Sequence, residues 1–228
     1  MIELYSWPAP NGQKLHLLME ELAISYRVVP IDITRGAQHT TSYRAINPNG
    51  KVPAIVDHAP ADGGAPVTVF ESGAIMMYLA EKERRFLPHD PRQRLEVMQW
   101  LFWQVGGLGP MMGQAQHFFR YASERVPYAI ARYQTETKRL LKLLDDRLET
   151  RAHICGDYSI VDMACFPWIR VHKMTGVALD EFPNVQAWYG RVRSRPAVGR
   201  AIDLLRDRWV DVSTSDQAKH NLFRAVQE

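Results

Sequence analysis

The pattern of hydrophobic and polar positions changes its period about one third of the way along the chain. Over residues 1–84, short apolar runs of strand length alternate with segments in which apolar residues recur every three or four positions, as on one face of a helix. From about residue 91 onward only the helical period is found. The chain is therefore predicted to contain a small α/β domain, residues 1–84, followed by an all-α domain, residues 91–205.

The first part of the chain predicts the order β-α-β-(α)-β-β-α. The predicted strands are 2–6, 26–32, the end of 47–57, and 67–70. The first helix opens near Asn11, a favoured N-cap because its side-chain oxygen can accept an N–H group of the first turn. The apolar face of this helix is formed by Leu15, Leu18, Met19 and Leu22. A further helix covers 71–83, and Pro30 is typical of an edge strand.

The second part of the chain carries only helical patterns. Helices are predicted over 92–105, 126–150, 158–171 and 182–202, the last divided in two at Pro196. The sequence "GGLGPMM" is expected to break or kink the first of them. Pro127 lies in a first turn, where a missing N–H costs nothing, and Ser159 and Asp162 form a variant of the capping box. Residues 211–228 are polar and are predicted to form a loosely docked tail.

Composition excludes several classes of function. The 28 basic and 25 acidic residues leave a net charge of +3 with the signs interspersed, so the chain lacks the basic stripe of a nucleic-acid-binding protein. No apolar run approaches the length of a transmembrane helix, and the N-terminal residues lack the pattern of a signal peptide. We therefore expect a cytoplasmic protein with no membrane partner. The eight histidines show no metal-ligand spacing, so no metal site is expected.

The two cysteines are not arranged as a redox motif. Cys155 and Cys165 lie ten residues apart and form no C-x-x-C sequence, so reduced thiols fit better than a disulfide framework. Cys165 falls in an apolar helical stretch and is expected to be buried. Cys155 precedes the capping box and is expected to be more accessible.

Five segments, in this order, carry a resemblance to a known family. They are "PNG" at 10–12, "DHAPADGG" at 57–64, "FESGAI" at 70–75, "QWLFWQVGGLGPMMGQ" at 99–114 and "YAIARYQTET" at 128–137. With them, the sequence resembles the glutathione transferase superfamily, and within it the bacterial Nu class and the yeast Ure2-like proteins. Some of these act as glutathione-dependent disulfide-bond oxidoreductases. The resemblance implies a thioredoxin-like first domain that binds glutathione, an all-α second domain and a homodimer.

The resemblance implies how the first domain would hold glutathione. In thioredoxin-like domains a cis-proline leaves the main-chain groups of the preceding residue facing a peptide, so Val52, before Pro53, would pair with the cysteinyl segment. Ser72 would bond the γ-glutamyl carboxylate at a helix N-terminus, and Glu71 would pair with the ammonium group. An ordinary trans proline and a plain helix start explain the same residues without a ligand.

Three further residues are candidates for contacts with glutathione. Gln38, in the loop after the second strand, and Lys51, in the turn before Pro53, would reach the glycyl carboxylate. Arg132, in the helical domain, would contact a second glutathione or the ligand of a partner subunit. Each of the three is also typical of a solvated surface side chain.

Asn11 is the candidate catalytic residue that the resemblance implies. The thiol of glutathione reacts as the thiolate, and an amide donor at a helix N-terminus favours that form through a charge-assisted hydrogen bond. Helix capping alone also explains an asparagine here. Tyr5 is the rival activator, although it is also typical of a core residue, and Ser6 is a weaker rival. A mechanism with Cys155 as the nucleophile has no support from the resemblance.

The predicted activity is attack of bound glutathione thiolate on a disulfide, with a second glutathione resolving the mixed disulfide. One departure from the family bears on it, because Ala9 stands where the disulfide reductases often carry a hydroxyl residue. Two alternatives stay open: transfer of glutathione to carbon electrophiles, and a glutathione-binding regulatory role with little catalysis. The aromatic residues Trp100, Phe102, Trp103, Phe118 and Phe119 are interpreted mainly as helix core, with some lining a second-substrate site.

Overall fold

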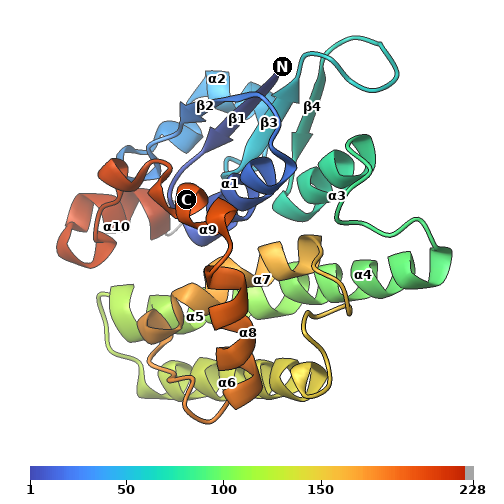
Figure 1. The fold of residues 1–228 in the computed structure, drawn as a ribbon. Coiled ribbons are helices and arrows are strands. Elements are labelled where there is room, and N and C mark those ends of the chain that lie inside the picture. The colour runs from blue at the N-terminus through green and yellow to red at the C-terminus, as the bar shows by residue number, and fades with distance from the viewer. Residues whose placement is uncertain (224–228) are drawn as a thin grey trace. The chain divides into compact units, whose positions relative to one another are not determined.

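A computed structural model of the chain describes residues 1–223, which fall into two compact units (Figure 1). The first unit comprises Met1–Lys82 together with the chain from Arg200 onward, and the second comprises Glu83–Gly199. The last part of the predicted polar tail, residues 224–228, lies outside the described residues.

The first unit is built on a mixed four-stranded sheet. Its strands are β1 (Ile2–Ser6), β2 (Tyr26–Pro30), β3 (Ala54–Asp57) and β4 (Val67–Phe70), in the order β2-β1-β3-β4. β1 pairs parallel with β2 and antiparallel with β3, and β3 pairs antiparallel with β4. All four predicted strands are confirmed, and Pro30 does lie on an edge strand. β2 ends two residues earlier than predicted, at Pro30, and a 3-10 turn follows at Ile33–Arg35.

Helices surround this sheet. They are α1 (Pro10–Leu22), the 3-10 turn Ala37–His39, α2 (Thr41–Ile46) and α3 (Ser72–Lys82). The predicted apolar face of α1 is confirmed, because Leu15, Leu18, Met19 and Leu22 are all buried. The predicted N-cap is wrong, since α1 is capped by Ala9 and Asn11 is already its second residue. Pro10 explains the earlier start, because its fixed φ and missing N–H suit the first position of a helix.

The chain from Arg200 onward completes the first unit. Its last described element, α10 (Asp216–Phe223), packs against the 3-10 turn Ile33–Arg35 that follows β2, and Figure 1 shows it in red beside that segment. Ala218 and Asn221 are buried there. This part of the polar tail is therefore a helix with an inward face.

The second unit is all-helical. Its elements are α4 (Pro91–Trp103), a π-helical turn (Gln104–Leu108), α5 (Gly109–Gln116), a second π-helical turn (His117–Tyr121), α6 (Pro127–Leu148), α7 (Ile160–Arg170) and α8 (Pro183–Arg193), and α9 (Pro196–Asp203) begins in it. The "GGLGPMM" segment does not end the helix. It widens the helix by a π turn, and Gly109 keeps helical φ and ψ of −60° and −56°. A Cβ on Gly109 would lie 2.9 Å from Nε2 and 3.2 Å from the main-chain oxygen of Gln104, so glycine lets the helix pack closely here.

The capping box predicted at the start of α7 is confirmed. Ser159 is the N-cap, and the side chain of Asp162 accepts a hydrogen bond from its main-chain N–H at 2.9 Å. Asp162 is fully buried and also accepts hydrogen bonds from the N–H of Ile154 at 3.1 Å and from Nε1 of Trp188 at 2.8 Å. This carboxylate therefore ties α7 to α8 and to the loop before α7.

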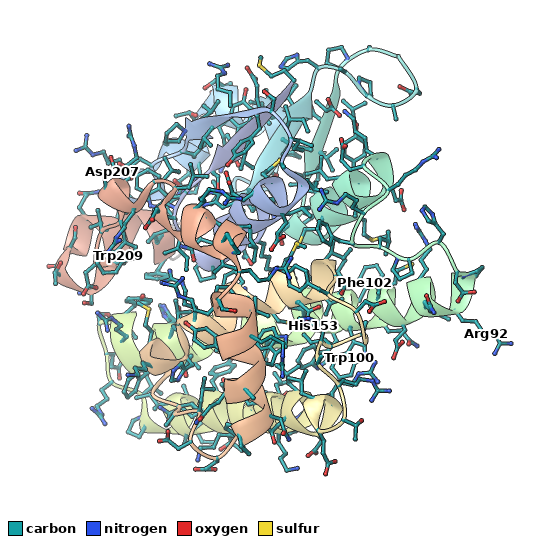
Figure 2. All side chains as sticks on the ribbon, in the orientation of Figure 1. Arg92, Trp100, Phe102, His153, Asp207 and Trp209 are labelled. Carbon is teal, nitrogen blue, oxygen red and sulfur yellow. The ribbon has the colours of Figure 1, made fainter. Side chains whose placement is uncertain are left out.

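The aromatic residues of α4 and the second π turn are only partly core. Trp100 and Trp103 pack edge to face with ring centroids 5.0 Å apart. Phe102, labelled with Trp100 in Figure 2, is 58% exposed, and Phe119 is 47% exposed. The interpretation as helix core is wrong for these two residues, because α4 buries only Val97 and Leu101 and the second π turn buries none of its residues.

Across residues 1–223, none of the helices is both long enough and apolar enough to span a membrane.

Candidate active site

Three segments emerge at one end of the sheet in the first unit. In the strand register, Tyr5 of β1 lies opposite Ala54 of β3, and Ala54 lies opposite Phe70 of β4. The residues that follow β1, precede β3 and follow β4 are therefore neighbours. These are the turn Trp7–Gly12, the pair Val52–Pro53 and the pair Glu71–Ser72, so the sheet brings together most of the predicted glutathione contacts of the first unit.

The turn between β1 and α1 is tight. The N–H of Ala9 donates to the carbonyl of Trp7 at 2.7 Å, and the N–H of Gln13 donates to the carbonyl of Ala9 at 2.9 Å. A Cβ on Gly12 would lie 2.2 Å from the carbonyl oxygen of Trp7 and 2.5 Å from Oγ of Ser6. Only glycine therefore fits at position 12.

Asn11 lies half-buried at the N-terminus of α1, where the helix presents positive partial charge. The first main-chain hydrogen bond of the helix is donated by the N–H of Gln13 to the carbonyl of Ala9. The N–H groups of Asn11 and Gly12 therefore lie ahead of the repeating main-chain hydrogen bonds of the helix. The N-cap, Ala9, has no side-chain acceptor to offer them. This arrangement suits a thiolate or another anion in front of α1.

The two rival activators are engaged elsewhere. The hydroxyl of Tyr5 donates to Oε2 of Glu3 at 2.8 Å. Burial and this hydrogen bond to a carboxylate both raise the pKa of Tyr5, so the phenol keeps its proton and directs it to Glu3. Ser6 is fully buried, with its Oγ 2.9 Å from Nε2 of His16.

The cysteines of the chain are poor nucleophiles. Neither forms a disulfide, and Cys165 is fully buried, as expected. Burial, together with the charges of Asp162 and Glu96, raises the pKa of the Cys155 thiol to about 12. Since the thiolate is the reactive form, Cys155 stays inert near neutral pH.

The loop before β3 is held by side-chain hydrogen bonds to its main chain. The Val52–Pro53 bond is cis, as expected. The carbonyl oxygen of Lys51 accepts hydrogen bonds from the hydroxyl of Tyr43 and from Nδ2 of Asn47, each at 2.6 Å. The side chain of Lys51 is exposed.

Glu71 and Ser72 open α3 beside that loop. Glu71 has a φ of 70°, in the left-handed region that costs a side-chain-bearing residue energy and that is often found at functional sites. Its Oε1 accepts from Nδ2 of Asn49 at 3.4 Å, which links α3 to the loop before β3. Ser72 is buried, and its Oγ accepts a hydrogen bond from Nζ of Lys14 at 3.2 Å. Sequence reasoning missed Lys14, because a lysine on a helix is ordinarily solvated.

Gln38 is buried, unlike a solvated surface residue. Its Nε2 donates to the carbonyl of Asn221 in α10 at 3.2 Å, while its buried Oε1 has no hydrogen-bond partner among residues 1–223. The carbonyl of Gln38 lies 3.1 Å from the position that a Cβ on Gly50 would take, so Gln38 borders the loop before β3. The contact between Asn221 of α10 and Gln38 could not be predicted from the sequence, which shows only a polar segment with helical spacing at this end of the chain.

Arg132 belongs to α6 of the second unit. It is exposed and lies 3.9 Å from Glu136, measured from its Nη1 to Oε2 of the carboxylate. Its contact with a ligand stays a prediction. Within the described part of the chain, His, Cys, Asp and Glu form no group of three or more that could hold a metal ion.

Comparison with known proteins finds matches to the glutathione S-transferase family in both units. Residues 1–81 match the family model "Glutathione S-transferase, N-terminal domain", and residues 110–196 match "Glutathione S-transferase, C-terminal domain". The disulfide-bond oxidoreductase YfcG of Escherichia coli is 51% identical over 203 residues, covering 89% of this chain and 94% of that protein. The disulfide-bond oxidoreductase YghU of the same organism is 41% identical, covering 87% of this chain and 73% of that protein.

Solved structures are similar over most of the chain. A glutathione transferase from Pseudomonas putida, with one glutathione disulfide bound per subunit, has a TM-score of 0.86 and 38% identity, covering 89% of this chain and 91% of that one. A glutathione transferase from Burkholderia graminis, with two glutathione molecules bound per subunit, has a TM-score of 0.84 and 40% identity, covering 89% and 87%.

Proposed function

Because this chain belongs to the glutathione S-transferase family, we propose that it reduces disulfide bonds with glutathione as its co-substrate. The observation that carries the proposal is the convergence of Asn11, Val52 and Ser72 at one end of the sheet, in front of the N-terminus of α1. The relatives named as disulfide-bond oxidoreductases support the reaction type.

In the proposed reaction, the thiolate of bound glutathione attacks one sulfur of the substrate disulfide. A mixed disulfide forms, the substrate S–S bond breaks, and the departing thiolate takes a proton from water. A second glutathione thiolate then attacks the glutathione sulfur of the mixed disulfide and releases the other substrate thiol. The products are glutathione disulfide and two thiols, so the two electrons that the substrate gains come from the two glutathiones.

Each predicted contact has a role in this scheme. The amide of Asn11 and the N-terminus of α1 lower the pKa of the glutathione thiol. Val52 pairs with the cysteinyl main chain, Glu71 with the ammonium group and Ser72 with the γ-glutamyl carboxylate. Gln38 and Lys51 hold the glycyl end, and Arg132 serves a second glutathione.

The test compares Asn11→Ala with Tyr5→Phe in the glutathione-dependent reduction of 2-hydroxyethyl disulfide, coupled to glutathione reductase. We expect Asn11→Ala to lower turnover about 10- to 100-fold, the value of one charge-assisted hydrogen bond. Tyr5→Phe should keep most of its turnover, because the Tyr5 hydroxyl is bonded to Glu3. Normal turnover of Asn11→Ala beside a large loss in Tyr5→Phe would assign the activating role to Tyr5 instead.

One observation favours a second candidate function, the transfer of glutathione to carbon electrophiles. Ala9 caps α1 and offers no hydroxyl to a sulfur at that end of the helix. Both reactions use the same thiolate and differ only in the electrophile that it attacks. Turnover of an aryl halide, measured beside turnover of the disulfide, therefore separates them. Turnover of the halide alone would favour the transferase, and tight glutathione binding without turnover of either substrate would favour a binding role.

We also propose a homodimer whose interface includes α4. Leu95 and Phe102 lie seven residues apart on α4, hence on one helical face, and are 56% and 58% exposed. Large apolar side chains exposed together on one face are typical of an interaction surface. The molecular mass from light scattering should be that of a dimer for the wild type and should shift toward the monomer in Phe102→Glu. A monomeric wild type would contradict this proposal.

A cytoplasmic location fits the same proposal, because two cysteines outside any disulfide and the use of reduced glutathione both suit a reducing compartment. Fractionation of cells that express the chain, with antibody detection, tests it.

A further inference from the structure

The ammonium group of Lys14 lies inside the first unit. Lys14 is 1% exposed and is flanked along α1 by Leu15 and Leu17, which are also fully buried. A lysine is almost never buried to this extent unless its charge is used. Its Nζ donates to Oγ of Ser72 at 3.2 Å, so the charge sits at the first residue of α3, where α1 packs against that helix.

This contact decides what the hydroxyl of Ser72 can do. An ammonium group has donors and no acceptor, so in the Lys14–Ser72 pair the serine oxygen must be the acceptor. The proton of the Ser72 hydroxyl is therefore directed to another acceptor. A cation bonded to the oxygen also makes that hydroxyl a stronger donor.

We propose that Lys14 is a positioning residue for the free α-carboxylate at the γ-glutamyl end of glutathione. It holds Ser72 with its proton directed at the carboxylate, and it adds a fixed positive charge to that of the N-terminus of α3. The proposal rests on the proposed function, in which Ser72 binds this carboxylate. With this role, Lys14 makes the site selective for thiol peptides that keep a free carboxylate at the γ-glutamyl end.

A purely structural role for Lys14 predicts a different result. If the Lys14–Ser72 bond only fastens α1 to α3, its loss loosens the site for every ligand alike. If Lys14 acts on the carboxylate, its loss weakens only ligands that carry that group. The two roles are separated by 4-aminobutanoyl-cysteinyl-glycine, which differs from glutathione in lacking the α-carboxylate alone.

The experiment measures the dissociation constants of both peptides, as S-methyl thioethers, by calorimetry on the wild type and on Lys14→Met. Lys82→Met is the matched control, because Lys82 is a second lysine with little exposure in the first unit, its side chain being 17% exposed, and it pairs with Asp57 instead of Ser72. The wild type and Lys82→Met should bind the glutathione thioether about tenfold or more tightly than the analogue, as expected for a charge-assisted contact. In Lys14→Met this ratio should fall toward one.

Two outcomes would count against the proposal in different ways. An unchanged ratio in Lys14→Met, with the wild type discriminating as expected, would overturn the role of Lys14 and leave the proposed function intact. A wild type that binds neither peptide would overturn the proposed function itself.

If Lys14→Met does not fold, Lys14→Gln replaces it, since the glutamine keeps an N–H donor but carries no charge. The ratio should fall there as well, and an unchanged ratio would again overturn the proposal.

Discussion

The Oγ of Ser6 lies 2.9 Å from Nε2 of His16, and both side chains are fully buried. This contact joins the last residue of β1 to the middle of α1, beneath the turn that presents Asn11. Burial lowers the pKa of His16 to about 4, opposed by its contact with the main chain of Ala201 and by the charge of Glu20. His16 is therefore neutral in the folded protein at neutral pH.

The free energy of unfolding should fall as the pH is lowered from 6.5 toward 4. In this interval His16 is protonated in the unfolded chain and neutral in the folded chain, so acid favours unfolding. The loss is at most about 3 kcal/mol, at about 1.4 kcal/mol for each unit of pKa difference. Urea unfolding between pH 7.5 and 4.5 measures it. His16→Gln should show a flatter dependence on pH, and parallel curves for the two proteins would contradict the prediction.

Gly12→Ala should damage the opening turn directly. The added Cβ would lie 2.2 Å from the carbonyl of Trp7, which is main chain and cannot move aside cheaply. We expect a loss of about 1–3 kcal/mol in the free energy of unfolding, the usual cost of overpacking, and weaker glutathione binding. Gly190→Ala in α8 is the control, because among the described residues nothing lies within 4 Å of its added Cβ. That variant should be neutral or slightly stabilised, and equal effects at the two glycines would contradict the prediction.

The sequence predicts the elements better than the contacts that shape the site. Periodicity locates α1 because Leu15 and its partners must all face the sheet. It misplaces the helix start because the capping preference of Asn11 and the fixed φ of Pro10 indicate adjacent positions, and the proline sets the start. Lys14 and Asn221 were missed for a common reason. Each is a polar residue buried by a segment remote in the sequence, and residue type alone predicts exposure for both.

Cys155→Ser should leave disulfide reduction unchanged. Burial raises the pKa of the Cys155 thiol to about 12, so the thiolate is scarce at the pH of the assay. The coupled 2-hydroxyethyl disulfide assay at pH 7 to 8 measures this. Mass spectrometry after brief treatment with iodoacetamide is a second check, and it should find Cys155 mostly unmodified in the folded protein. A large loss of turnover in Cys155→Ser would revive a cysteine-nucleophile mechanism.

Asn221 should act on glutathione binding through Gln38. Its Nδ2 donates to the carbonyl of Thr34 at 2.6 Å, and its own carbonyl accepts from Nε2 of Gln38 at 3.2 Å. These bonds fix the 3-10 turns after β2 and leave Oε1 of Gln38 as the atom that can accept from a ligand. Asn221→Ala removes the bond to Thr34 and lets α10 shift away from Gln38.

We expect Asn221→Ala to raise the KM for glutathione several-fold with little change in kcat, because a neutral hydrogen bond contributes about 0.5–1.5 kcal/mol and Gln38 does not touch the reacting sulfur. Lys219→Ala, which removes only the ion pair with Asp216 on the same helix, is the control and should match the wild type. Steady-state kinetics with varied glutathione at saturating disulfide measures both constants. A fall in kcat at unchanged KM would show that α10 acts on the chemical step, and would contradict a role confined to Gln38.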